Sequence, residues 1–430
     1  MLEKLNLLIP LGNFIRNKSI QNFLFLSFIQ SSNVLISIIS MPLLIQSIGV
    51  DQFGLVNLAL SVIVLLNILV VFGYNLAAPR EVALNSEDKT ALSHIVSNVF
   101  SAKFLLASMA SLVILIGVFG LGLFSEYGTI LVFSLLLLFS EAALPLWFFQ
   151  GMEKMKLVSV ANVFSKLLFL MGIVLFIHDP EQSKWVNFMM GFLGLGVNLL
   201  LLGYIHSFLG IKFFRPEFAA IWKSLKDNVL LFFSSLASHL SINGGLIILS
   251  FFSTAATLGM YSLAERVVMV LRLFPAMVVQ AIFPNASKLY KEDERKFFLF
   301  LRGVYLRVLL SGALIAGGTY LAAPFIISVL SKSELQESVT YLQMLSAVPF
   351  LACLNIGNVT IMLVSDLKEL LFKASWMMCV YMLGVTALLT SLMGGIGLCI
   401  GIISTEIVVF LICLVLLYRY KRSLFHGFYS

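Results

Sequence analysis

Long apolar runs separated by short polar breaks recur along the whole chain. A membrane-spanning helix needs about 20 mainly apolar residues, and the sequence shows this signal twelve times. The pattern therefore predicts an all-α polytopic membrane protein. The predicted spans are residues 20–46, 53–78, 94–124, 129–150, 157–178, 185–209, 228–251, 256–285, 298–330, 339–364, 370–392 and 396–418.

Composition supports a membrane protein. The 430 residues are 60% hydrophobic and 11% charged, whereas soluble domains are roughly half apolar and a quarter charged. Residues 1–19 hold an apolar stretch too short to span a membrane and no cleavage pattern, which predicts a retained interfacial helix. The cysteines have neither metal-site nor redox spacing, so we expect reduced thiols facing lipid or core. They are Cys353, Cys379, Cys399 and Cys413.

The basic residues between the spans predict the orientation. Lys and Arg collect on cytoplasmic loops, and with the N-terminus inside, the outer loops hold only Lys184 and Lys332. Both termini are thus predicted to be cytoplasmic. The stretch "PLWFFQGMEKMK" then becomes the inner end of the fourth span, with Trp147 at the membrane interface. The net charge of +7 follows from these loops, and no nucleic-acid-binding module is apparent.

An internal repeat is predicted from two short segments. "FGLVNLALSV" at 53–62 matches "LGMYSLAERV" at 258–267, and the same offset of 205 pairs Pro79 with Pro284. Duplication of six helices keeps two lobes parallel, as in transporters whose site lies between the repeats. The predicted organisation is a first six-helix lobe with the N-terminal segment (1–209), a cytoplasmic connector (210–227) and a second six-helix lobe (228–430).

Several segments resemble a known family. "PLWFFQGMEKMK", "FGYNLAAPREVA", "LGMYSLAERV" with "QAIFPNASKLY", and "AVPFLACLNIGNVTIMLV" are similar to the corresponding segments of the Wzx polysaccharide repeat-unit flippases, and the resemblance covers essentially the whole chain. It implies a member of the multidrug/oligosaccharidyl-lipid/polysaccharide exporter superfamily in a bacterial inner membrane. It further implies a protein that flips an undecaprenyl-diphosphate-linked oligosaccharide to the outer leaflet by ion-coupled alternating access. Besides membrane lipids, a polysaccharide polymerase and a chain-length regulator are suggested partners.

Carrying a diphosphate and sugars across hydrocarbon requires a polar, preferably cationic, path, so ionisable residues at helix depth are the candidates. Arg holds phosphate by its planar fork and Lys as a point charge. The candidate substrate-binding residues are Lys103, Lys166, Arg266, Arg272 and Arg307, and the candidate ion-coupling residues are Glu265, Glu141 and Glu406. No cofactor or metal site is predicted.

Each candidate also has a structural interpretation. Lys103 and Arg307 could snorkel to the interface, and Lys166 could serve in an ion pair that holds helices together. Glu406 could pair with a neighbouring hydroxyl, and Glu141 could form a hinge with the proline one turn later.

Glu265 and Arg272 are seven residues apart, so they share a helix face within about 20° but differ by roughly 10 Å in height. Each therefore needs a partner on another helix, a cavity or substrate. We predict that this face looks into a cleft between the lobes, with Arg272 near the diphosphate and Glu265 as a coupling site. The alternative is that Glu265 pairs with Arg266 to lock the second lobe.

Other functions are less well supported. The sequence has no Walker A, HExxH, CxxC or nucleophile-elbow pattern. It also lacks the large outer domain usual in membrane polymerases and lipid-linked glycosyltransferases, so no enzyme is predicted. The transporter alternative is a multidrug or organic-cation exporter of the same superfamily, which would prefer an acidic cavity. The candidate charges are net basic, which suits a diphosphate better.

Overall fold

The computed structural model describes residues 18–429, and the regular structure of this range is helical. The predicted interfacial helix of residues 1–19 lies almost wholly outside the described residues. The first half contains α2 (Lys18–Val71), α3 (Tyr74–Leu84), α4 (Lys89–Leu115), α5 (Gly128–Ser134), α6 (Leu136–Ala143), α7 (Leu146–Gly151), α8 (Met155–Phe176) and α9 (Ser183–Ser207). The second half contains α10 (Phe218–Asn243), α11 (Gly245–Ser250), α12 (Ala255–Leu271), α13 (Leu273–Glu292), α14 (Glu294–Ser331), α15 (Gln336–Leu345), α16 (Ala347–Leu354), α17 (Ile356–Val364), α18 (Lys368–Tyr381), α19 (Ala387–Tyr420) and α20 (Arg422–Tyr429).

Nine helical segments of the described range are long and apolar enough to cross a membrane. Two of them are double, because the chain turns at Gly49 (φ 78°) in α2 and at Gly394 (φ 59°) in α19. Glycine adopts positive φ readily, whereas a side chain there would be strained. Dividing these two segments gives eleven spans in the described residues, and a span at α10 and α11 stays a prediction. The all-α polytopic prediction is confirmed.

By its contacts the described chain divides into two compact units. The first holds the residues up to Leu43 together with Ile63–Ser235, and the second holds Leu44–Val62 together with Leu236–Ser430. The second unit therefore includes the middle of α2. The division of the chain into lobes at 1–209 and 228–430, and the internal repeat, stay predictions.

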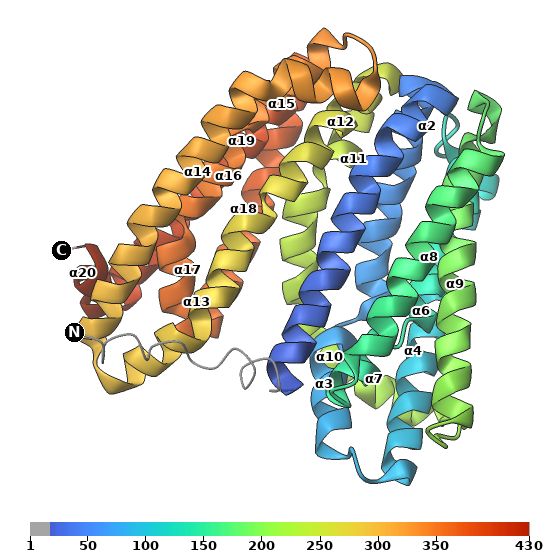
Figure 1. Ribbon diagram of the computed structural model, residues 1–430, viewed down its shortest axis with the longest axis horizontal. Coiled ribbons are helices and arrows are strands. Elements are labelled where there is room, and N and C mark those ends of the chain that lie inside the picture. The colour runs from blue at the N-terminus through green and yellow to red at the C-terminus, as the bar shows by residue number, and fades with distance from the viewer. Residues whose placement is uncertain (1–17, 430) are drawn as a thin grey trace, which may run out of the picture. The chain divides into compact units, whose positions relative to one another are not determined.

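In the first unit, α4, α6, α8 and α9 pack side by side (Figure 1). Gly191 and Gly194 allow α9 to lie close to α6, because an added Cβ would come within 2.9 Å of the Leu137 amide nitrogen and 2.5 Å of Ser140 Oγ, respectively. Close approach through small residues is a common way of packing helices in membranes. The backbone around α6 is thus fixed by its neighbour.

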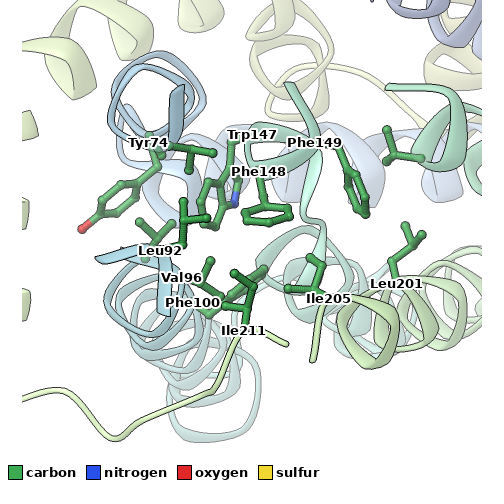
Figure 2. Close-up of a cluster of buried hydrophobic side chains, with 14 of the residues drawn as sticks. Tyr74, Leu92, Val96, Phe100, Trp147, Phe148, Phe149, Leu201, Ile205 and Ile211 are labelled. Atoms are coloured by element: carbon green, nitrogen blue, oxygen red, sulfur yellow. The ribbon is translucent and has the colours of Figure 1, made fainter. Parts of the chain in front are cut away.

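Trp147 lies in the core of the first unit and not against lipid. Its indole is 1% exposed, its ring centre is 5.4 Å from that of Phe100, and Figure 2 shows it beside Leu92 and Val96. Trp147 therefore does not face lipid, and its position at the level of the membrane interface stays a prediction. Tryptophan is frequent in interfacial belts, but its large apolar area also stabilises a buried aromatic cluster.

In the second unit, α20 is anchored against the rest of the bundle. Arg302 on α14 donates from Nε to Phe428 O (2.9 Å) and from Nη2 to Gly427 O (2.8 Å), which satisfies carbonyls at the end of α20. The Tyr429 hydroxyl donates to Asn358 Oδ1 at 2.8 Å. Burial raises the pKa of Tyr429, so the hydroxyl remains a donor.

The middle of α2 meets α12 at two glycines of the second unit. A Cβ on Gly54 would lie 2.4 Å from the Gly259 amide nitrogen, and a Cβ on Gly259 would lie 2.1 Å from Val50 O. The two backbones are therefore in direct contact, which fixes the height at which α2 meets α12. The four cysteines are free and buried within this unit, as the reduced, core-facing alternative expects.

Candidate functional site

Glu141 lies where the fourth span is broken. Helix α6 ends at Ala143, Leu144 is extended (φ −69°, ψ 114°), and Pro145 cannot donate a backbone hydrogen bond. The Leu144 amide bonds Glu141 O, which leaves Ser140 O without its usual helical donor. Asn198 Nδ2 on α9 donates to that carbonyl at 2.9 Å. The break is thus stabilised by a neighbouring helix, as buried polar backbone in a membrane requires.

Two lysines surround Glu141 within the first unit. Lys103 on α4 is 0% exposed, and its Nζ lies 4.0 Å from Glu141 Oε1. This is an ion pair without a direct hydrogen bond, because Lys103 Nζ has no hydrogen-bond partner among the described residues. Lys166 on α8 also attracts Glu141 electrostatically. The cluster, which we call the lysine cluster, carries two positive charges against one negative charge.

In the second unit, Arg266 on α12 is held by Asn57 on α2. Asn57 Oδ1 accepts two bonds, from Arg266 Nη2 (2.6 Å) and Nε (3.2 Å), while Asn57 Nδ2 donates to Phe53 O at 2.8 Å. Asn57 is 6% exposed. The amide oxygen of Asn57 thus accepts from one edge of the guanidinium, formed by Nε and Nη2, without neutralising its charge.

Arg272 lies at a joint between helices. Pro275 removes the amide that would bond Leu271 O, so α12 ends at Leu271 and α13 begins at Leu273. The Arg272 guanidinium forms an ion pair with Glu406 on α19. Arg272 therefore has a partner on another helix, one of the options that its position in the sequence allowed.

Glu265 has a different environment from Arg272. The Tyr261 hydroxyl, one turn earlier on α12, donates to Glu265 Oε1 at 3.4 Å. Arg266 and Arg272 both attract Glu265 electrostatically, and Arg266 also donates to Asn57. We call Glu265, Arg266, Arg272 and Glu406 the arginine cluster, and its formal charges balance.

Arg307 lies apart from both clusters. Its side chain is exposed, and its Nε donates to Gly303 O on the same helix at 2.8 Å. The structure thus groups seven of the eight candidate residues into two clusters and leaves Arg307 on the surface of α14. The substrate and coupling roles of all eight stay predictions.

Sequence reasoning missed the neutral partners of these charges. Asn57, Tyr261 and Asn198 hold Arg266, Glu265 and the broken α6, respectively. An asparagine inside an apolar span was the available signal, since a buried amide must find partners. Within the described residues, no group of three or more His, Cys, Asp or Glu is placed to hold a metal ion.

The chain is similar in sequence to proteins of a known family. The family described as "Polysaccharide biosynthesis protein" matches residues 19–290. An Escherichia coli (strain K12) protein named "Putative O-antigen transporter" is 23% identical over 390 residues, which cover 90% of this chain and 94% of that protein.

Two solved structures share the fold. The lipid II flippase MurJ in an inward closed conformation has a TM-score of 0.69 at 14% identity, covering 93% of this chain and 87% of that chain. A multidrug resistance MATE family transporter in an inward-facing conformation has a TM-score of 0.66 at 15% identity, covering 91% and 99%. The family match spans more than half of the chain and agrees with the helical, multi-pass fold. The chain belongs to the polysaccharide biosynthesis protein family.

Proposed function

We propose that this protein is a flippase for undecaprenyl-diphosphate-linked oligosaccharide repeat units of O-antigen or a related surface polysaccharide. It would move them from the cytoplasmic to the periplasmic leaflet of the bacterial inner membrane. The observation that carries this proposal is the lysine cluster: two lysines share one carboxylate within an apolar helical unit. Family membership and the Escherichia coli relative support it.

The chemistry of the lysine cluster suits a diphosphate. A buried charge is costly unless it is paired, and the ammonium of Lys103 has no hydrogen-bond partner among the described residues. An anionic headgroup would accept hydrogen bonds from this ammonium, whereas a lipophilic cation would add further positive charge. The polyprenyl tail can remain in lipid, so the protein needs to provide a polar environment for the diphosphate and sugars only.

We further propose that the arginine cluster couples transport to an ion gradient, with Glu265 as the titrating or cation-binding group. The Tyr261 hydroxyl donates to Glu265, while Glu406 is paired with Arg272. A carboxylate held this way can change occupancy without breaking the Arg272–Glu406 pair. The alternating-access cycle would then alternate between substrate at one cluster and ion at the other.

The orientation that we propose places both termini and the 210–227 connector in the cytoplasm. The flipped product on the periplasmic leaflet is what a polysaccharide polymerase with a chain-length regulator would consume, and these are the proposed protein partners. An impermeant maleimide tests the topology: it should label a cysteine placed at Glu181 in intact cells and leave one at Lys223 unlabelled.

The flippase proposal is tested by deleting the gene in the host and extracting lipids. We expect undecaprenyl-linked repeat units to accumulate, shielded from the periplasm. Lys166→Ala should reproduce the accumulation at native expression, and Lys166→Arg should relieve it in part, because the positive charge is kept. Lys156→Ala is the matched control, since Lys156 is an exposed lysine on the same helix. Unchanged surface polysaccharide with new drug sensitivity would instead identify a multidrug exporter.

A further inference from the structure

A groove with a basic mouth lies between α18 and the second half of α19, within the second unit. Its volume is about 590 Å³, in the range of sites that bind small molecules. Its wall is apolar, and Met377, Leu411 and Val415 on that wall are 51%, 49% and 54% exposed. The groove is therefore open along its side.

The mouth of the groove is formed by Lys373 near the start of α18 and by Arg419 and Tyr420 at the end of α19. Lys373 Nζ lies 5.3 Å from the centre of the Tyr420 ring, a cation–π distance. No ion pair among the described residues involves Lys373 or Arg419. Two exposed positive charges thus stand at one end of an apolar wall without a carboxylate partner.

We propose that this groove binds an acidic glycerophospholipid of the surrounding bilayer. The phosphate contacts Lys373 and Arg419, and an acyl chain lies along Met377, Leu411 and Val415. Basic pockets at the ends of membrane helices are suited to anionic headgroups, and the apolar wall matches an acyl chain rather than a free phosphate. Tyr420 adds an amphipathic ring at the headgroup, as interfacial tyrosines do.

The groove is separate from the charge clusters assigned to transport. Glu406 and Arg419 lie on the same helix thirteen positions apart, which is about 20 Å along the axis. The lysine cluster belongs to the other unit. The open side also favours a bilayer lipid, which is present at high concentration around the protein. The proposal therefore does not depend on the flippase function, and either can fail alone.

The test uses the full-length protein purified in detergent and titrated with phosphatidylglycerol or with phosphatidylcholine of the same acyl chains. Bound lipid is counted by native mass spectrometry. Phosphatidylglycerol should bind more tightly, and Lys373→Ala with Arg419→Ala should weaken it roughly 30-fold. The matched control is Lys291→Ala with Arg295→Ala, which removes one exposed lysine and one exposed arginine outside the groove.

A second variant tests the apolar wall without altering the charges. Val415→Trp places a ring in the groove and should weaken binding of phosphatidylglycerol while the mouth stays intact. Equal binding of both lipids, or equal losses in the groove and control variants, would overturn the assignment. If undecaprenyl diphosphate displaced phosphatidylglycerol at a concentration below the one that phosphatidylglycerol needs to bind, the groove would instead be assigned to the transported lipid.

Discussion

The two charge clusters differ in how they balance buried charge. In the lysine cluster Glu141 attracts two ammonium groups, and the fully buried Lys103 has no hydrogen-bond partner among the described residues. In the arginine cluster the charges balance, and neutral Asn57 and Tyr261 supply further hydrogen bonds. A buried ion pair contributes little net stability when satisfied but is costly to break. The comparison indicates that the lysine cluster is the less satisfied of the two.

Both clusters lie beside a proline that breaks a helix. Pro145 follows Glu141 by one turn, and Pro275 follows Arg272 by three residues. Proline frees a carbonyl one turn earlier and relaxes the constraint on the local helix axis. Charged side chains at such joints can couple a change of occupancy to a change of helix direction. The roles proposed above assign different ligands to the two joints, an anion to the first cluster and a cation to the second.

The largest expected effect comes from neutralising Glu141. Glu141→Gln leaves Lys103 buried without its counter-charge, and we expect the free energy of unfolding to fall by about 3 kcal/mol. Glu406→Gln should cost less, about 1 to 2 kcal/mol, because Glu265 still attracts Arg272. Chemical unfolding in detergent micelles measures both variants.

The double variant Lys103→Met with Glu141→Gln is the control for this first prediction. It removes the unpaired ammonium together with its partner, so most of the lost stability should return. Equal losses for Glu141→Gln and Glu406→Gln would contradict the difference drawn between the clusters.

Glu265→Gln should affect stability less than Glu141→Gln or Glu406→Gln, and it should affect the coupling of transport to the ion gradient more. The Tyr261 hydroxyl can still donate to the amide oxygen, so the free energy of unfolding should change by less than about 1 kcal/mol. Transport measured in vesicles should fall and lose its dependence on the ion gradient. The structural-lock interpretation predicts the reverse pattern: an unstable protein whose folded fraction remains normally coupled.

The membrane helices could be predicted from the sequence, because an apolar run of about 20 residues is by itself typical of a membrane-spanning helix. It also placed Glu141 beside a proline and Glu265 with Arg272 on one face. It could not pair Arg272 with Glu406, because these residues are 134 positions apart in the sequence and meet only in the folded chain. The same limit applies to the burial of Trp147, because its aromatic neighbour Phe100 lies on another helix.

The smallest expected effect is that of Arg307. Its position within a predicted membrane span made Arg307 a candidate for phosphate binding. In the structure its side chain is exposed and donates to Gly303 O on its own helix. This is the geometry of a side chain that extends along a helix surface. Arg307→Gln should therefore change the free energy of unfolding by no more than about 0.5 kcal/mol. It should also leave repeat-unit export near the unmodified level in the lipid-accumulation assay, where Lys166→Ala fails. If Arg307→Gln instead blocked export while the protein accumulated normally, a cationic group outside both clusters would be needed for transport. The substrate path would then extend beyond the lysine cluster to the surface of α14.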